Sequence, residues 1–225
     1  MRKAKHLWRA VVVAALVIVA MSAVAQASVP TPPRRGQDGS THEDWTFDTD
    51  ANPAAPSTVS NPYGDPTASV VFDPVLGSGW QFDLGLGTQT GMWDLGSLGT
   101  ISIDLPNRPY EGGLKEIWIS VVCFEDPGWM AAPTVDIVSQ GQITFVSEDT
   151  YLVEEDPISG AWWAHLYKWQ IVPNPNSEQV IITSDLFGSV IDRVDIDTIC
   201  VPEPATCAAL LMGAPFLLLL RRRKA

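Results

Sequence analysis

Residues 114–124 read LKEIWISVVCF, and both faces of this stretch are apolar. Successive side chains of a β-strand point to opposite faces of its sheet. The two faces consist of Ile117, Ile119 and Val121 on one side and Trp118, Val122 and Phe124 on the other. A strand with two apolar faces is typical of the interior of a sheet, so this stretch predicts a central strand with a neighbour on each side.

The rest of the chain after Asp44 reads as short β segments separated by Pro, Gly, Asn and Asp. In Thr100–Leu105 apolar and polar residues alternate, which is typical of a half-exposed strand. The spacing of strands and turns predicts an all-β fold, a single antiparallel β-sandwich over residues 42–200. It is expected to be jelly-roll-like, with the general architecture of carbohydrate-binding modules, an analogy that assigns no function. The predicted strands are Trp45–Asp48, Ser69–Phe72, Trp80–Leu84, Thr100–Leu105, Leu114–Phe124, Thr134–Ser139, Gln142–Ser147, Trp162–Val172, Gln179–Ser184 and Val190–Cys200.

The charge of the chain is unevenly distributed. All 26 acidic residues lie between Asp38 and Glu203, whereas eight of the 14 basic residues lie near the two ends. The part between the ends is therefore strongly acidic, and nucleic acid is not expected as a partner, because neutralising phosphates requires a basic surface. Solubility outside the cell accounts for such a surface, which also attracts divalent cations.

Residues 1–27 have the pattern of a secretory signal peptide. A basic start precedes the apolar run Val11–Ala20, and Ala25 and Ala27 supply the small residues that signal peptidase requires before its cleavage point. Residues 28–41 follow as a Pro- and Gly-rich linker with little to bury. The sandwich is therefore expected to be exported through the inner membrane.

The last 25 residues contain three elements in sequence. Val201, Pro202, Glu203 and Pro204 form a stiff, extended segment, because each proline ring fixes φ and disfavours helix before it. Residues 205–220 carry no charge and predict a short transmembrane helix. Four cations then hold that end in the cytoplasm, by the positive-inside rule: Arg221, Arg222, Arg223 and Lys224.

This tail, residues 201–225, resembles the PEP-CTERM sorting signal of Gram-negative envelope and biofilm-matrix proteins. The resemblance implies that an exosortase, a membrane cysteine transpeptidase, recognises the tail as a partner. It also implies a single-pass membrane intermediate, followed by a place in the cell envelope, at the outer surface or in the extracellular matrix. The alternative is a plain tail anchor that no enzyme processes.

Aromatic residues supply the candidate ligand sites. Trp163, Tyr167 and Trp169 share one face of the strand Trp162–Val172 with His165. Such a row could stack against the apolar faces of sugar rings, or it could be the core of a small sandwich, where aromatics provide much of the buried area. Trp129 lies in a turn-rich stretch and is the better candidate for an exposed ring.

A structural calcium ion is a further candidate. Asp48, Asp50 and Asn52 place oxygen ligands at alternate positions, but the chain lacks the Gly and Glu that an EF-hand loop needs. A site that joins these residues to Asp195 and Asp197 would link the first and last strands. The other interpretation is a set of solvated turn carboxylates.

The cysteines allow one disulfide within the body, between Cys123 and Cys200, and export would permit it. Two buried thiols in neighbouring strands are the alternative. No catalytic residues are predicted: outside the leader only His42 and His165 are present, and nucleophile-elbow, HExxH and phosphate-loop motifs are absent from the sequence.

Taken together, the sequence predicts a non-enzymatic exported protein of the cell envelope or the extracellular polysaccharide matrix, sorted through its tail. A carbohydrate-binding module is the second interpretation, with polysaccharide as partner. A secreted glycoside hydrolase is the third, because acidic residues are plentiful.

Overall fold

The computed structural model describes residues 29–108, 113–156, 158 and 160–201. The predicted signal peptide with Ala25 and Ala27, the sorting residues from Pro202 to Lys224 and the predicted helix 205–220 lie outside the described residues. Among those that are described, no helix has the length and apolar character needed to cross a membrane.

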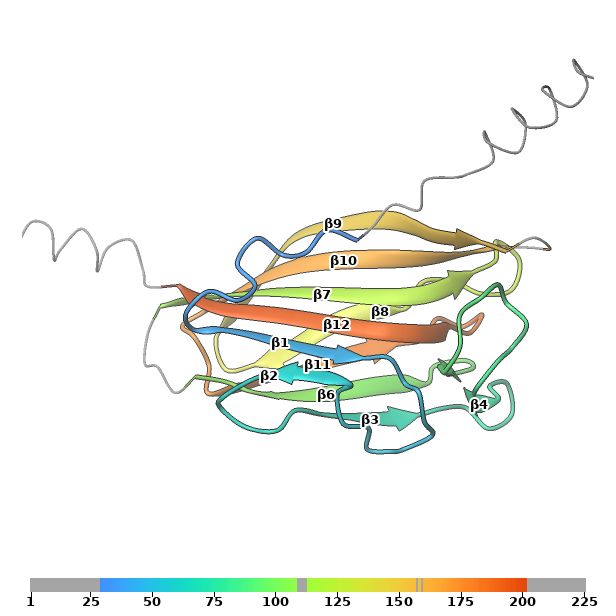
Figure 1. The fold of residues 1–225 in the computed structure, drawn as a ribbon, viewed down its shortest axis with the longest axis horizontal. Coiled ribbons are helices and arrows are strands. Elements are labelled where there is room, and N and C mark those ends of the chain that lie inside the picture. The colour runs from blue at the N-terminus through green and yellow to red at the C-terminus, as the bar shows by residue number, and fades with distance from the viewer. Residues whose placement is uncertain (1–28, 109–112, 157, 159, 202–225) are drawn as a thin grey trace, which may run out of the picture.

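The described chain folds into two antiparallel sheets that pack face to face (Figure 1). The larger sheet has the strand order β2-β1-β12-β7-β10-β9, with β5 pairing to the start of β12 and β4 pairing to β5. The smaller sheet has the order β3-β6-β11-β8. The predicted all-β sandwich is confirmed. The strands are β1 Ser40–Trp45, β2 Thr58–Ser60, β3 Thr67–Val71, β4 Gly79–Gln81, β5 Met92–Asp94, β6 Thr100–Pro106, β7 Leu114–Glu125, β8 Thr134–Ser139, β9 Gln142–Glu155, β10 Ala161–Val172, β11 Ser177–Thr183 and β12 Val190–Val201.

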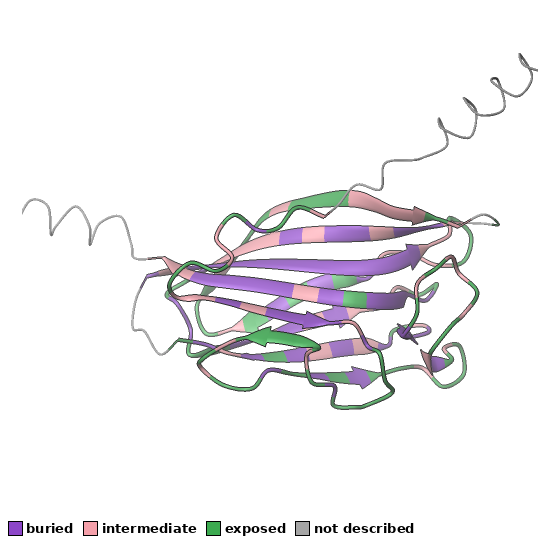
Figure 2. Cartoon of the chain, viewed as in Figure 1, coloured by how far each residue is buried: buried purple, intermediate pink, exposed green. Residues whose placement is uncertain are grey.

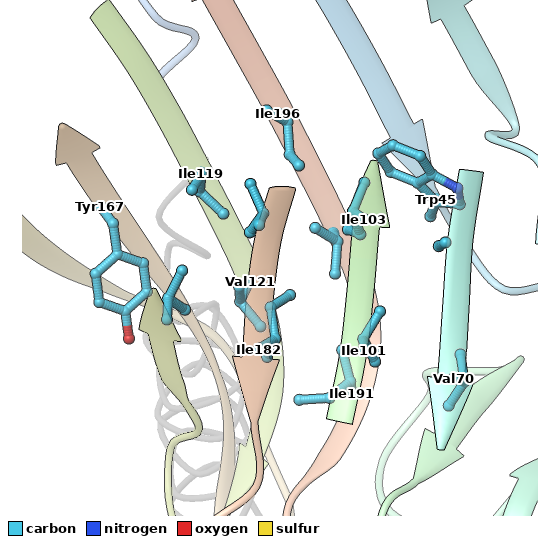
Figure 3. Close-up of a cluster of buried hydrophobic side chains, with 14 of the residues drawn as sticks. Trp45, Val70, Ile101, Ile103, Ile119, Val121, Tyr167, Ile182, Ile191 and Ile196 are labelled. Atoms are coloured by element: carbon cyan, nitrogen blue, oxygen red, sulfur yellow. The ribbon is translucent and has the colours of Figure 1, made fainter. Parts of the chain in front are cut away.

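Strand β7 is central, as its two apolar faces predict. It pairs with β12 on one side and with β10 on the other, and it is buried along nearly its whole length (Figure 2). Its inner face meets the smaller sheet. There the side chains of both sheets form one core, part of which Figure 3 shows, with Ile119, Val121 and Ile196 opposite Ile101, Ile103 and Ile182.

The outer face of β7 is covered as well. Val122 and Phe124 form a second apolar cluster with Trp162 of β10, and the segment between β4 and β5 packs on it through Leu84 and Leu86. The indole N–H of Trp162 donates a hydrogen bond to the backbone oxygen of Leu86. The larger sheet therefore buries apolar surface on both sides.

The structure corrects the predicted linker over 28–41. Residues 29–39 cross the outer face of the larger sheet, and β1 begins at Ser40 (Figure 1). Arg34 Nε lies 3.3 Å from a Glu116 carboxylate oxygen, and Arg35 donates a hydrogen bond of 2.7 Å to Asp197. These contacts join residues that are far apart in sequence, so composition alone could not reveal them.

Strand β1 also differs from its prediction at Trp45–Asp48. The strand ends at Trp45, because the chain turns at Phe47, which has a φ of 49°. Phe47 is nevertheless buried in the inner core. The apolar pattern was a signal of burial there and not of an extended backbone.

Of the two interpretations of Cys123 and Cys200, the disulfide is not formed, since both thiols are free. The cysteines do lie on neighbouring strands, but Cys123 pairs with Ile191 whereas Cys200 pairs with Lys115. Along β7 that register separates them by roughly 27 Å, at about 3.4 Å per residue.

Trp118 tests the two-sided burial of β7. It lies on the outer face, is 6% exposed, and has the Lys168 ammonium 5.0 Å from its ring centre. Trp118→Ala is expected to lower the free energy of unfolding by about 3–5 kcal/mol, because the contacts of a large buried ring are lost. Denaturant unfolding measures the change. Trp129→Ala, at a ring that is 77% exposed, is the matched control and should change stability by less than about 0.5 kcal/mol. A loss below about 1 kcal/mol at Trp118 would contradict the outer cover described here.

Candidate functional site

A cleft of about 760 Å³ opens at one end of the sandwich. It lies between the β7–β8 connection, the start of β10 and the β11–β12 connection. We call it the Trp129 cleft. Its walls are mostly apolar and consist of Glu125, Asp126, Pro127, Gly128, Trp129, Met130, Ala131, Gly160, Ala161, Trp163 and Phe187.

Trp129 is held at the cleft by its own turn. The Trp129 N–H donates to the Asp126 carbonyl at 3.0 Å, and Asp126 and Met130 form a two-way backbone bridge. The Asp126 carboxylate accepts a further hydrogen bond from the Gly128 N–H at 3.0 Å. The turn is thus fixed by local bonds, while the indole itself is 77% exposed.

Two more rings reach the cleft from other parts of the chain. Trp163 projects from the inner face of β10, near the end of the sandwich, and is half-buried. Phe187 lies in the turn Asp185–Gly188, which a backbone hydrogen bond of 3.0 Å closes, and its side chain is exposed. Two connections of the sandwich and the start of β10 therefore each contribute one aromatic ring.

A carboxylate–histidine–carboxylate chain adjoins the cleft. Glu125, which lines the cleft, has a carboxylate oxygen 2.6 Å from Nε2 of His165, and Nδ1 of His165 lies 3.0 Å from a Glu148 carboxylate oxygen. The ring of Tyr167 stacks near the His165 ring at a centroid distance of 6.1 Å. Burial, with the nearby Glu148 charge as a second cause, raises the pKa of the Tyr167 hydroxyl above its ordinary value.

The predicted aromatic row on β10 divides between cleft and core. Trp163 lines the cleft, but Tyr167 is 6% exposed and belongs to the inner core. Trp169 packs edge to face against Phe145, at a centroid distance of 4.9 Å. The structure thus brings Trp129 and Trp163 together and leaves Tyr167 and Trp169 elsewhere.

The five residues of the predicted calcium site are not brought together. Asp195 and Asp197 contact Arg35 and lie alongside β1, where Asp197 pairs with His42. The Asn52 amide instead bonds both backbone groups of Val70 on β3. Asp48 and Asp50 follow the end of β1. Calcium binding stays a prediction, and this arrangement does not support a shell made of all five side chains.

The Arg35 contact has an electrostatic consequence. Burial raises the pKa of Asp195 to about 6, despite the Arg35 charge. For Asp197 burial acts in the same direction, but His42 and Arg35 outweigh it and the pKa is lowered. The Asp197 carboxylate in turn raises the pKa of His42, whose Nδ1 lies 3.7 Å from it.

The parts of the site that the sequence did not reveal are Phe187, Glu125 and the pairing of His165 with two glutamates. Phe187 occupies a turn, and an isolated aromatic in a turn is a weak signal, although it is the same signal that identified Trp129. The His165 chain depends on the register of three strands. That register cannot be read from one strand alone.

Comparison with known proteins gives likenesses in fold. No protein-family model matches the chain, and no curated protein matches it. A family 35 carbohydrate-binding module from an environmental isolate is similar at a TM-score of 0.35 and 14% identity, over 60% of this chain and 98% of that one. A family 35 module from Cellvibrio japonicus is similar at a TM-score of 0.33 and 10% identity, over 60% of this chain and 99% of that one. A PA14 sugar-binding domain from an RTX adhesin is similar at a TM-score of 0.24 and 12% identity, over 70% of this chain and 88% of that one.

The buried carboxyl groups of the larger sheet predict an unusual dependence of stability on pH. Burial is the main cause that raises the pKa of Glu43 and of Asp192 to about 7 each. An acid with a raised pKa binds more protons folded than unfolded between its two pKa values, so stability falls as pH rises through that interval. The raised pKa of His42 acts in the same direction. The free energy of unfolding is therefore expected to be lower at pH 7.5 than at pH 5.

Denaturant unfolding at the two pH values measures this difference. Asp192→Asn should reduce it by at most about 3 kcal/mol, because only about two units of the raised pKa, from pH 5 to about pH 7, fall in this interval and each unit is worth about 1.4 kcal/mol. Asp136→Asn, on the exposed face of β8, is the control and should leave the difference unchanged. Stability that stays level or increases between pH 5 and pH 7.5 would contradict the assignment.

Proposed function

We propose that this protein is a non-catalytic, exported polysaccharide-binding protein, and that the saccharide binds in the Trp129 cleft. One observation carries the proposal: an exposed indole on a hydrogen-bonded turn shares a cleft of about 760 Å³ with Trp163 and Phe187. Leaving a ring of that size in water forgoes the free energy that its burial would contribute. An exposed ring held in place beside two others favours a binding role.

The chemistry of the cleft suits a sugar. The C–H faces of a pyranose are apolar and flat, so they can stack on indole and phenyl rings and remove apolar surface from water. The carboxylates of Glu125 and Asp126 can accept hydrogen bonds from sugar hydroxyls at the cleft edge. Apolar walls with a few polar groups are typical of sites for small molecules.

The position of the cleft fits attachment through the tail. β12 begins at the cleft end of the sandwich, where the Ser189 hydroxyl donates to the Ala131 carbonyl, and it ends at Val201, directly before Pro202 (Figure 1). Val201, the last described residue, therefore lies at the opposite end of the strands from the cleft. A chain held at the membrane or outer surface through its tail would direct the cleft outward, toward extracellular polysaccharide.

Trp129→Ala tests saccharide binding. The full-length protein in detergent is first screened on a glycan array that includes the extracellular polysaccharide of its host, and the best ligand is then titrated by calorimetry. The substitution should weaken binding about tenfold or more, equivalent to about 1.4 kcal/mol, with stability unchanged. Phe82→Ala, at another exposed ring outside the cleft, is the matched control and should bind as the wild type does. Equal binding by the Trp129→Ala protein, or no binding of any glycan by the wild type, would refute the proposal.

The tail is tested separately, by the intact mass of the mature protein from its host. An exosortase substrate should lose everything after a point close to Pro204, including Cys207 and the basic cluster Arg221–Lys224. Glu203→Ala should make the longer form accumulate, because it removes the charge between the two prolines. If the mature protein keeps its last residues and Glu203→Ala changes nothing, the tail is an ordinary anchor.

A further inference from the structure

Three metal-ligating side chains converge beside the Trp129 cleft. Cys123 and Glu125 lie on β7 and His165 lies on β10, and one ligand atom from each lies within 4.8 Å of the others. The strand register explains the convergence. Cys123 and Glu125 are two residues apart and share the inner face, and His165 pairs with Val121 on that same face. A thiol, a carboxylate and an imidazole thus point into one small space.

The orientation of His165 matches that of a metal ligand. Its Nδ1 is engaged by Glu148 of β9 at 3.0 Å, which leaves Nε2 directed toward Glu125. Metal-binding histidines are commonly held in this way, with a carboxylate on the nitrogen that does not bind the metal. The His165 side chain is only 8% exposed, so its ring has little freedom to turn.

We propose that Cys123, Glu125 and His165 bind a divalent transition-metal ion of the zinc type, with Glu148 as the group that orients His165. A sulfur, a nitrogen and an oxygen ligand together favour zinc over calcium or magnesium, which take oxygen ligands. Glu125 lines the cleft and its side chain is 32% exposed, so the ion would have a route from solvent and a fourth position open to water. This inference does not depend on saccharide binding.

Small movements would complete the site. Ligand atoms about 2.0–2.1 Å from a tetrahedral zinc ion lie roughly 3.3 Å from each other, whereas Glu125 and His165 are now 2.6 Å apart. The ion would replace their hydrogen bond, and the two atoms would move apart by less than 1 Å. The Cys123 thiol is fully buried and would give up its proton to solvent as it binds the metal.

Cobalt(II) is the probe, since it occupies zinc sites and reports its ligands by absorption. The full-length chain in detergent, with excess Mg²⁺ to fill carboxylate sites, should bind one equivalent of Co²⁺. It should show a thiolate-to-cobalt charge-transfer band together with the intense visible bands of a tetrahedral site. One equivalent of Zn²⁺ should abolish both. Absence of the charge-transfer band would overturn the proposal.

Substitutions locate the site. Cys123→Ser should remove the charge-transfer band, and His165→Gln should weaken Co²⁺ binding at least a hundredfold. Glu148→Gln should weaken it about tenfold, since such outer groups typically contribute factors of 10–100. Cys200→Ser is the matched control, at the free thiol near the far end of β12, and should keep the full spectrum. A band that persists in the Cys123→Ser protein would place the metal elsewhere and refute the assignment.

If those variants do not fold, the proposal can still be tested on a chain whose proposed metal ligands are all unchanged. In the Cys200→Ser/Cys207→Ser chain, Cys123 is the one remaining cysteine. X-ray absorption of its zinc-loaded form should show one sulfur at about 2.3 Å with nitrogen or oxygen at about 2.0–2.1 Å. A shell of nitrogen and oxygen alone would show that the Glu125–His165–Glu148 chain is only a hydrogen-bond network.

Discussion

The two-sided burial of β7 is the constraint on which the rest of the molecule depends. A strand with one apolar face needs one partner layer, but β7 needs two. The smaller sheet covers its inner face, while residues 29–39 and the segment between β4 and β5 cover its outer face. Because those outer layers are irregular chain and not a third sheet, side-chain bonds hold them in place. Glu154, for example, accepts hydrogen bonds from the backbone and hydroxyl of Thr88, which fixes the β4–β5 segment on β9.

The two ends of the sandwich differ in how they are closed. At the end where β12 finishes, Lys115 of the larger sheet and Glu178 of the smaller sheet form a fully buried ion pair between the layers. Asn107 completes it, donating to a Glu178 carboxylate oxygen at 3.2 Å and to the Pro175 carbonyl at 2.6 Å. Burying two charges is expensive unless they are paired and hydrogen-bonded, so this end is held closed. At the other end aromatic rings remain exposed around a cleft.

The sequence predicts the strands whose burial is regular, and it fails where contacts bridge distant segments. Alternation identified β6, and two-sided apolarity placed β7 at the centre of its sheet. Residues 29–39 look like a linker because Pro and Gly dominate them; only the fold shows that Arg35 meets the carboxylates of β12. The same reasoning applies to the site. The exposure of Trp129 could be predicted because this aromatic residue lies in a turn. The contact between Glu125 and His165 could not, because it depends on the β7–β10 register, which a single sequence does not reveal.

The distribution of charge constrains what the cleft can bind. In the part of the chain that the structure describes, most basic side chains form ion pairs with carboxylates on or between the sheets. The pairs are Arg34 with Glu116, Arg35 with Asp195 and Asp197, Lys115 with Glu178, Lys168 with Glu116, and Arg193 with Asp44. Among the described residues that line the Trp129 cleft are Glu125 and Asp126, and none of these described lining residues is basic. A uronate or sulfated sugar would therefore meet like charges on an acidic protein without a cation to offset them. Under the proposed function, stacking on Trp129 and hydrogen bonds to carboxylates favour a neutral saccharide, and a metal ion bound beside Glu125 would be the one local source of positive charge.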